Sequence, residues 1–157
     1  MVRMGRIQNL WQESMIKFAK IRGVDLLTSV FPGAVLSGSF MAFKFENLDI
    51  WNKALDLSAG INELAKCFPK YELFNLCHQI RKASDSVGLN IAEGCTGQSN
   101  PEQRRFLNYS IRSGIEVVGC LFIAKRKDYL PIEQFHFFYT EYEILIRMIT
   151  RFRDNLR

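Results

Sequence analysis

The segment from Gln79 to Gly94 carries two helical stripes instead of one. An α-helix turns by about 100° per residue, so residues three, four or seven positions apart share a face. One stripe is apolar and consists of Leu73, Leu76, Ile80, Val87 and Ile91. The other lies about a quarter-turn round the helix, and its members are small or polar: Gln79, Ala83, Ser86, Asn90 and Glu93. A helix with two such faces needs two different neighbours, which indicates a helical bundle.

Three further segments place apolar residues at alternating steps of three and four, the pattern of a helix with one buried face. The four expected helices are Asn47–Cys67, Tyr71–Glu93, Pro101–Lys127 and Ile132–Leu156. Short connections place successive helices antiparallel. The sequence therefore predicts an all-α fold, an antiparallel up-down-up-down four-helix bundle.

Residues typical of helix ends flank these segments. Asn47 is expected to cap the first helix, and Asn100 and Gln103 to form a capping box around Pro101 at the start of the third. Gly94 is expected to end the second helix in a left-handed conformation, which glycine adopts without a steric penalty.

The third helix is rich in small residues on its buried side, which predicts close packing against the second helix. These residues are Ser110, Ser113, Gly114 and Gly119. The aromatic residues of the fourth helix follow its apolar seam, so we interpret them as core residues and not as platforms for stacking bases.

The polar stripe belongs to a motif that resembles a known family. The motif comprises Gln79-Ile80-Arg81-x-Ala83 and Ser86-Val87-x-x-Asn90-Ile91-Ala92-Glu93-Gly94, flanked by Phe45-x-x-Leu48-x-Ile50-Trp51-x-x-Ala54, Phe106-Leu107 and Ser113-x-x-Glu116. Over roughly residues 43–157 the chain resembles the bacterial four-helix bundle proteins, also called the 23S rRNA intervening-sequence protein or S23 family. The resemblance implies a homo-oligomeric ring, in particular a pentamer, and no known reaction. One departure is Arg112, where the family has a glycine, and it places a large charged side chain near the close packing.

Residues 1–40 behave differently from the bundle domain, residues 41–157. Residues 7–21 could form one amphipathic helix, residues 24–40 lack sustained periodicity, and basic residues outnumber acidic ones between Arg3 and Asp25. Two interpretations stay open: a translated leader ahead of a natural start at Met41, or a basic arm that touches RNA or a partner.

Composition favours a cytoplasmic protein without a metal or cofactor. No run of 18 apolar residues is present, which argues against a membrane span. The four cysteines lie at least ten positions apart and include no C-x-x-C pair, so we expect reduced thiols and neither a disulfide framework nor a zinc site.

The candidate acid–base groups do not form a catalytic pattern. His78 and Glu93 lie fifteen positions apart on one helix, roughly 22 Å along its axis. We expect the polar stripe to meet its neighbour in a buried network that fixes helix register, and we favour this structural role over catalysis. The residues assigned to this network are Gln79, Ser86, Asn90, Glu93 and Glu116. The sequence predicts no enzyme.

The formal net charge of +5 is compatible with a polyanionic partner. The residues predicted to bind nucleic acid are Lys125, Arg126, Lys127, Arg147 and Arg151. The leading hypothesis is a ring-forming bundle that binds RNA, DNA or a nucleoprotein. The resemblance supports it, because family members are encoded within insertions in 23S rRNA genes and related bundles accompany retroelement reverse transcriptases. The alternative is a protein–protein adaptor that does not bind nucleic acid.

Overall fold

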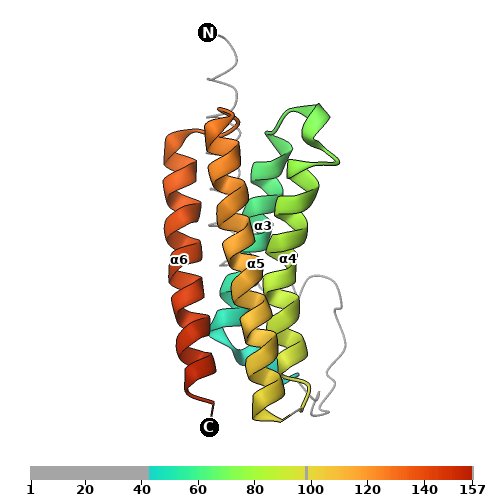
Figure 1. The fold of residues 1–157 in the computed structure, drawn as a ribbon, viewed down its shortest axis with the longest axis vertical. Helices are drawn as coiled ribbons and strands as arrows, with labels where there is room; N and C mark the ends of the chain where they lie inside the picture. Colours follow the sequence, from blue (N-terminus) through green and yellow to red (C-terminus); the bar gives the residue numbers. More distant parts are fainter. Residues whose placement is uncertain (1–42, 98, 157) are drawn as a thin grey trace, which may run out of the picture. The chain divides into compact units, whose positions relative to one another are not determined.

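The computed structural model describes residues 43–97 and 99–156, and the expectations for residues 1–40 lie outside this part of the chain. Four α-helices lie side by side with their long axes in a common direction (Figure 1). They are α3 (Asp49–Lys66), α4 (Leu76–Gly94), α5 (Asn100–Arg126) and α6 (Ile132–Asp154), with short 3-10 helices η1 (Lys44–Asn47) and η2 (Lys70–Glu72). No strand occurs in the described ranges, so the all-α prediction with four helices is confirmed.

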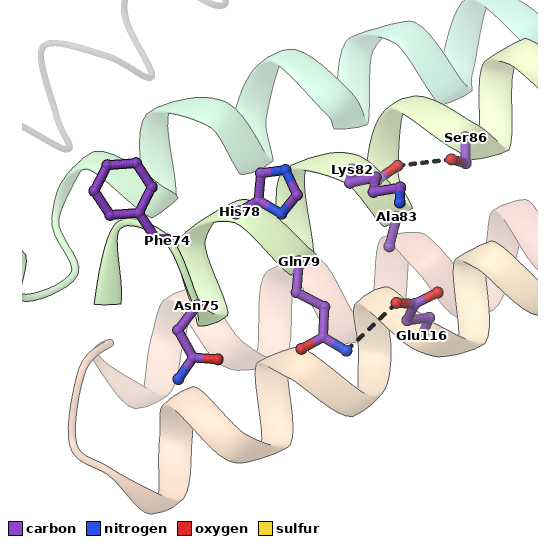
Figure 2. Close-up of a pocket in the computed structure, with 8 residues that line it drawn as sticks. All are labelled: Phe74, Asn75, His78, Gln79, Lys82, Ala83, Ser86 and Glu116. Atoms are coloured by element: carbon purple, nitrogen blue, oxygen red, sulfur yellow. Dashed lines mark hydrogen bonds between the residues drawn. The ribbon is translucent and has the colours of Figure 1, made fainter. Parts of the chain in front are cut away.

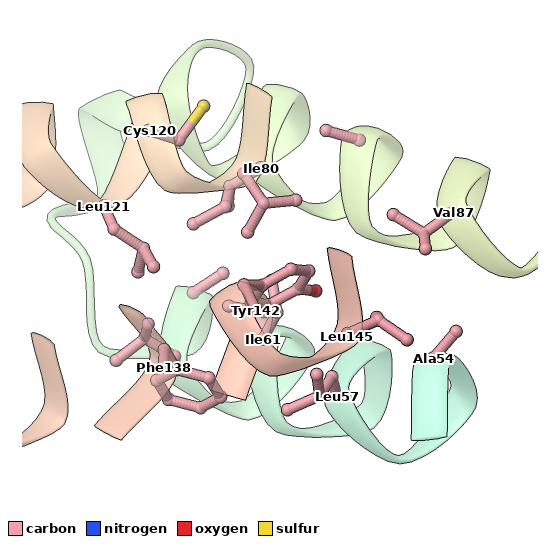
Figure 3. Packing of buried hydrophobic residues seen from close by; sticks show 14 of the residues in the cluster. Ala54, Leu57, Ile61, Ile80, Val87, Cys120, Leu121, Phe138, Tyr142 and Leu145 are labelled. Carbon is pink, nitrogen blue, oxygen red and sulfur yellow. The ribbon is translucent and has the colours of Figure 1, made fainter. Parts of the chain in front are cut away.

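The core lies between the four helices and is built from the predicted apolar stripes. All four helices contribute fully buried residues, among them Ile61 from α3, Ile80 from α4, Leu121 from α5 and Tyr142 from α6. Figure 3 shows these side chains pointing toward one another. The heptad spacing of α6 accounts for five buried core residues in succession: Phe135, Phe138, Tyr142, Leu145 and Ile149.

The second helix begins later than the sequence indicates. The chain forms η2 up to Glu72, and Asn75 has φ −119° and ψ −105°, so α4 starts at Leu76 and not at Tyr71. Leu73, predicted to be a core residue, is exposed. The Glu72 carboxylate accepts a hydrogen bond from the Leu76 backbone N–H at 3.3 Å, and it thereby caps α4 from outside the helix.

The predicted N-caps are wrong by one residue. Leu48 precedes α3 and Ser99 precedes α5, and neither makes a side-chain capping hydrogen bond. The Gln103 side chain donates to Cys95 Sγ at 3.6 Å and does not close a capping box. This contact ties the start of α5 to the end of α4.

Gly94 ends α4 as predicted, but not through a left-handed cap. The glycine with positive φ is Gly97, at 85°. A Cβ at Gly94 would lie 3.2 Å from Phe106 Cβ on α5, which is closer than ordinary contacts allow. Gly94 therefore favours the close approach of α5, which a larger residue would allow only if Phe106 shifted slightly.

One helix in the described ranges, α5, is long and apolar enough to cross a membrane by length and composition, with 33% of its apolar window buried. The same test is met by core helices of soluble bundles. The middle of α5 also carries the charged residues Arg112 and Glu116, both exposed, which are costly inside a bilayer. Because only a third of this apolar window is buried, much of the apolar surface of α5 lies outside the core.

Candidate functional site

An open pocket lies between the first turns of α4 and the middle of α5 (Figure 2). It brings together three residues of the predicted polar network, Gln79, Ser86 and Glu116, with His78 and Lys82. Gln79 Nε2 donates to Glu116 Oε1 at 3.5 Å, so the two side chains meet across the helices. The pocket offers hydrogen-bonding groups, but no hydroxyl or thiol in it is hydrogen-bonded to a histidine.

The expectation of a buried polar network is wrong. Gln79, Glu93 and Glu116 are exposed. Among the described residues, Gln79 and Glu116 are the one pair of the predicted network that forms a hydrogen bond between helices. Ser86 Oγ donates to Lys82 O and Asn90 Nδ2 to Ser86 O, both at 2.7 Å. Serine and asparagine readily satisfy themselves on the preceding turn of their own helix, which removes the need for a partner on α5.

The close α4–α5 contact is made by smaller groups. Ala83 is buried, and Ser110 Oγ donates to Val87 O at 2.9 Å, which confirms close packing of Ser110 against α4. Gly114 faces α6 instead, because a Cβ there would lie 3.2 Å from Ile146. Arg112 is exposed, so its charged side chain lies at the surface and not within this contact.

Sequence reasoning did not identify the most elaborate polar cluster, which surrounds Glu72. This carboxylate is 3% exposed and joins the loop before α4 to the loop after α5. Its two oxygens accept hydrogen bonds from Lys127 Nζ at 2.6 Å, Tyr129 Oη at 3.1 Å and Asn75 Nδ2 at 3.0 Å. Tyr71 Oη lies 3.0 Å from Tyr129 Oη, and because Tyr129 gives its proton to Glu72, Tyr71 is the donor.

These contacts determine the protonation of the cluster. The hydrogen bond from Lys127 is the main cause that lowers the pKa of Glu72. The pKa of Tyr129 is raised by burial and by its hydrogen bond to the negatively charged Glu72. Glu72 is therefore a carboxylate and Tyr129 a neutral phenol near neutral pH, as the donor directions require.

We expect Glu72 to make the stability of the fold depend on pH. Because its pKa is lower in the folded chain, its stabilising contribution is complete above the unfolded pKa of about 4.3 and is lost as pH falls through the folded value. Glu72→Gln should therefore unfold at lower urea concentration than the wild type at about pH 7, and the gap should narrow at about pH 3.

Glu63→Gln is the matched control, because Glu63 pairs with Lys66 on the exposed surface of α3. This variant should remain close to the wild type at both pH values. If the difference in unfolding urea concentration between Glu72→Gln and the wild type is the same at both pH values, Glu72 does not stabilise the fold as a carboxylate.

The five residues predicted to bind nucleic acid do not form one surface. Lys125, Arg126 and Lys127 lie at the end of α5, near the start of α6, whereas Arg147 is fifteen residues into α6, roughly 22 Å further along its axis. Figure 1 shows these two places toward opposite ends of the bundle. Arg151 follows one turn after Arg147. The predicted antiparallel order of the third and fourth helices implies this separation, because each group lies toward the C-terminal end of its own helix.

Three of the five also have partners that reduce their availability. Lys127 is bound to buried Glu72, and Arg147 pairs with exposed Glu143 at 2.5 Å. Lys125 Nζ lies 4.2 Å from the centre of the Phe135 ring. Arg126 and Arg151 are exposed and form no ion pair with a described residue.

No group of three or more His, Cys, Asp or Glu side chains suited to a metal ion occurs in the part of the chain that the structure describes. All four cysteines are free thiols. Burial, and next the nearby Glu116, raise the pKa of Cys120 to about 11, so this thiol is protonated and unreactive near neutral pH.

The fold and its surface define a small four-helix protein. It has a polar cluster around the buried Glu72, and its basic residues are distributed over separate parts of the surface. Residues 46–151 match the family described as 23S rRNA-intervening sequence protein. The chain belongs to this family, which confirms the resemblance found in its motifs.

One solved structure agrees at the level of the fold. It is that of a protein of unknown function from the S23 ribosomal protein family of Bacteroides thetaiotaomicron, with a TM-score of 0.63 and 21% sequence identity. The match covers 68% of this chain and 96% of that one. No curated protein sequence matches the chain.

Proposed function

We propose that this protein is a non-enzymatic, up-down-up-down bundle that assembles into a cytoplasmic homo-oligomeric ring, a pentamer, and binds RNA. The observation that carries the proposal is an exposed apolar surface on α5. Ile115, Phe122 and Ile123 are 58%, 51% and 46% exposed, and they surround Gly119, where a Cβ would meet nothing within 4 Å. We name these four residues the α5 apolar face.

An apolar face of this kind favours association, because burying it removes hydrocarbon from water. Gly119 adds to the argument, since glycine in an exposed helix interior costs about 1 kcal/mol relative to alanine. Gly119 makes no tight contact with the described residues, and a glycine at this position is accounted for if a second copy approaches there.

RNA as the partner is supported by two considerations. The family is described as an rRNA-intervening sequence protein, and the chain carries a formal net charge of +5. A ring would repeat each basic surface once per subunit, and repetition converts weak phosphate contacts into avid, salt-sensitive binding.

Gly119→Arg tests the assembly. We expect the variant to stay folded but to lose the oligomer in native mass spectrometry, because a guanidinium would have to be buried in the interface. The matched control is Ala59→Arg, which adds the same charge at an exposed position of α3. An unchanged subunit number in Gly119→Arg, together with unchanged helicity, would contradict the proposed interface.

A protein–protein adaptor is the second candidate function. It is favoured by Phe74, which lines the pocket and is 91% exposed, and by Tyr71 three residues earlier, which is 75% exposed. Exposed aromatic side chains are enriched where proteins bind one another. Steep salt dependence of RNA affinity would favour the first function, and a partner retained regardless of salt would favour the adaptor.

A further inference from the structure

Six arginines are concentrated on the first half of α5 and the last half of α6, two helices that pack against each other. They come from segments about forty residues apart in the sequence, and no lysine occurs among them. We name them the arginine face: Arg104, Arg105, Arg112, Arg147, Arg151 and Arg153.

Two hydrogen bonds establish that the two segments adjoin. Arg104 Nη1 donates to Leu156 O at 3.4 Å, and Arg153 Nη1 donates to Asn108 Oδ1 at 2.6 Å. Arg104, Asn108 and Arg112 follow one another at steps of four, so they form one row along α5. Arg153 of α6 meets the middle of this row.

The arginine face has an excess of positive charge. Three carboxylates lie within it, Glu102, Glu143 and Asp154, and each pairs with one arginine: Arg105, Arg147 and Arg153 respectively. Arg104, Arg112 and Arg151 are exposed and pair with no carboxylate among the described residues. Three of the six arginines are therefore without a carboxylate partner among the described residues.

Helix dipoles explain only half of this arrangement. Arg151 and Arg153 lie in the last turn of α6, where cations are stabilised. Arg104 and Arg105 lie near the start of α5, where the dipole favours anions and opposes cations. Arg105 is paired with Glu102 of the same helix, whereas Arg104 has no carboxylate partner among the described residues and is available to an external anion.

We propose that the arginine face binds the phosphate backbone of folded RNA, and this inference rests on the proposed function. Arginine presents planar paired donors that match phosphate oxygens, and such contacts position RNA without reading its bases. Binding is therefore sequence-independent. It takes place at the arginine face and not at Arg126, at the other end of α5.

The test compares two triple variants of the full chain with equal loss of charge. The first is Arg104→Gln, Arg112→Gln and Arg151→Gln; the control is Lys70→Gln, Lys82→Gln and Arg126→Gln, whose residues are exposed and form no ion pair with a described residue. The probes are two RNA duplexes of about 20 base pairs with unrelated sequences, titrated across a range of salt concentrations.

The wild type should bind both duplexes equally. The first variant should bind at least about tenfold more weakly, and the slope of log affinity against log salt should flatten by about 2 to 3, since each lost phosphate contact removes about 0.9. The control should change by less than about threefold, through the long-range loss of charge.

Three results would overturn the inference. They are an unchanged affinity in the first variant, an equal or larger loss in the control, and a strong preference for one duplex sequence. If the wild type binds neither duplex even at low salt, both the proposed RNA function and this inference are wrong. The wild-type titration alone shows this, so it is distinguished from a failure of the arginine face only.

Discussion

Tyr142→Ala should destabilise the protein by about 3–5 kcal/mol, the range for removing a large buried aromatic ring. Tyr142 is fully buried on α6 and lies at the centre of the core in Figure 3. Its loss would leave a cavity between all four helices and would remove a hydrogen bond, because Tyr142 Oη lies 2.6 Å from Ser84 Oγ on α4. Urea unfolding of the variant and the wild type, followed by circular dichroism, measures the difference.

A double-mutant cycle separates the ring from the hydroxyl. Tyr142→Phe and Ser84→Ala should each cost about 1–3 kcal/mol, because each leaves the other hydroxyl buried. The double variant should cost less than the sum of the two, since no unpaired group remains. Additive costs would show that the two hydroxyls are independently satisfied, and the α4–α6 bond would then lose its assigned role.

The core was predictable because burial follows helical periodicity. Ile61, Ile80 and Leu145 each belong to an apolar stripe with helical spacing on its own helix. Such a stripe predicts burial from the local sequence alone, without knowledge of which residues it contacts. The start of α4 was not predictable in this way. Glu72 leaves the helix because its carboxylate is bound by Lys127 and Tyr129, more than fifty residues away, and no local pattern indicates that contact.

The candidate site was predicted less well than the fold, for two physical reasons. Ser86 and Asn90 have the spacing of an interhelical stripe, but their own backbone carbonyls satisfy them first. Lys127 looked like a free cation because its partner is remote in sequence. The row of Arg104, Asn108 and Arg112 was visible as spacing, but its contact with α6 was not.

Ser110→Leu should destabilise the fold by about 2–4 kcal/mol, from overpacking and the loss of one buried hydrogen bond. Ser110 is fully buried, and its hydroxyl reaches Val87 O at 2.9 Å, so the backbone of α4 lies directly opposite. Three additional carbon atoms fit there only if α5 moves away from α4. The free energy of urea unfolding measures the cost.

Two further variants distinguish helix spacing from hydrogen bonding. Ser110→Ala keeps the small volume and should cost only about 1 kcal/mol. Ser113→Leu makes the same exchange one turn later on α5, where the side chain is half-buried, and its cost should be well below that of Ser110→Leu. If Ser110→Leu is as stable as Ser110→Ala, the two helices can separate freely. The small residues of α5 would then not determine the distance between α4 and α5, and a close approach by a second copy at Gly119 would be the remaining explanation for small residues on this helix.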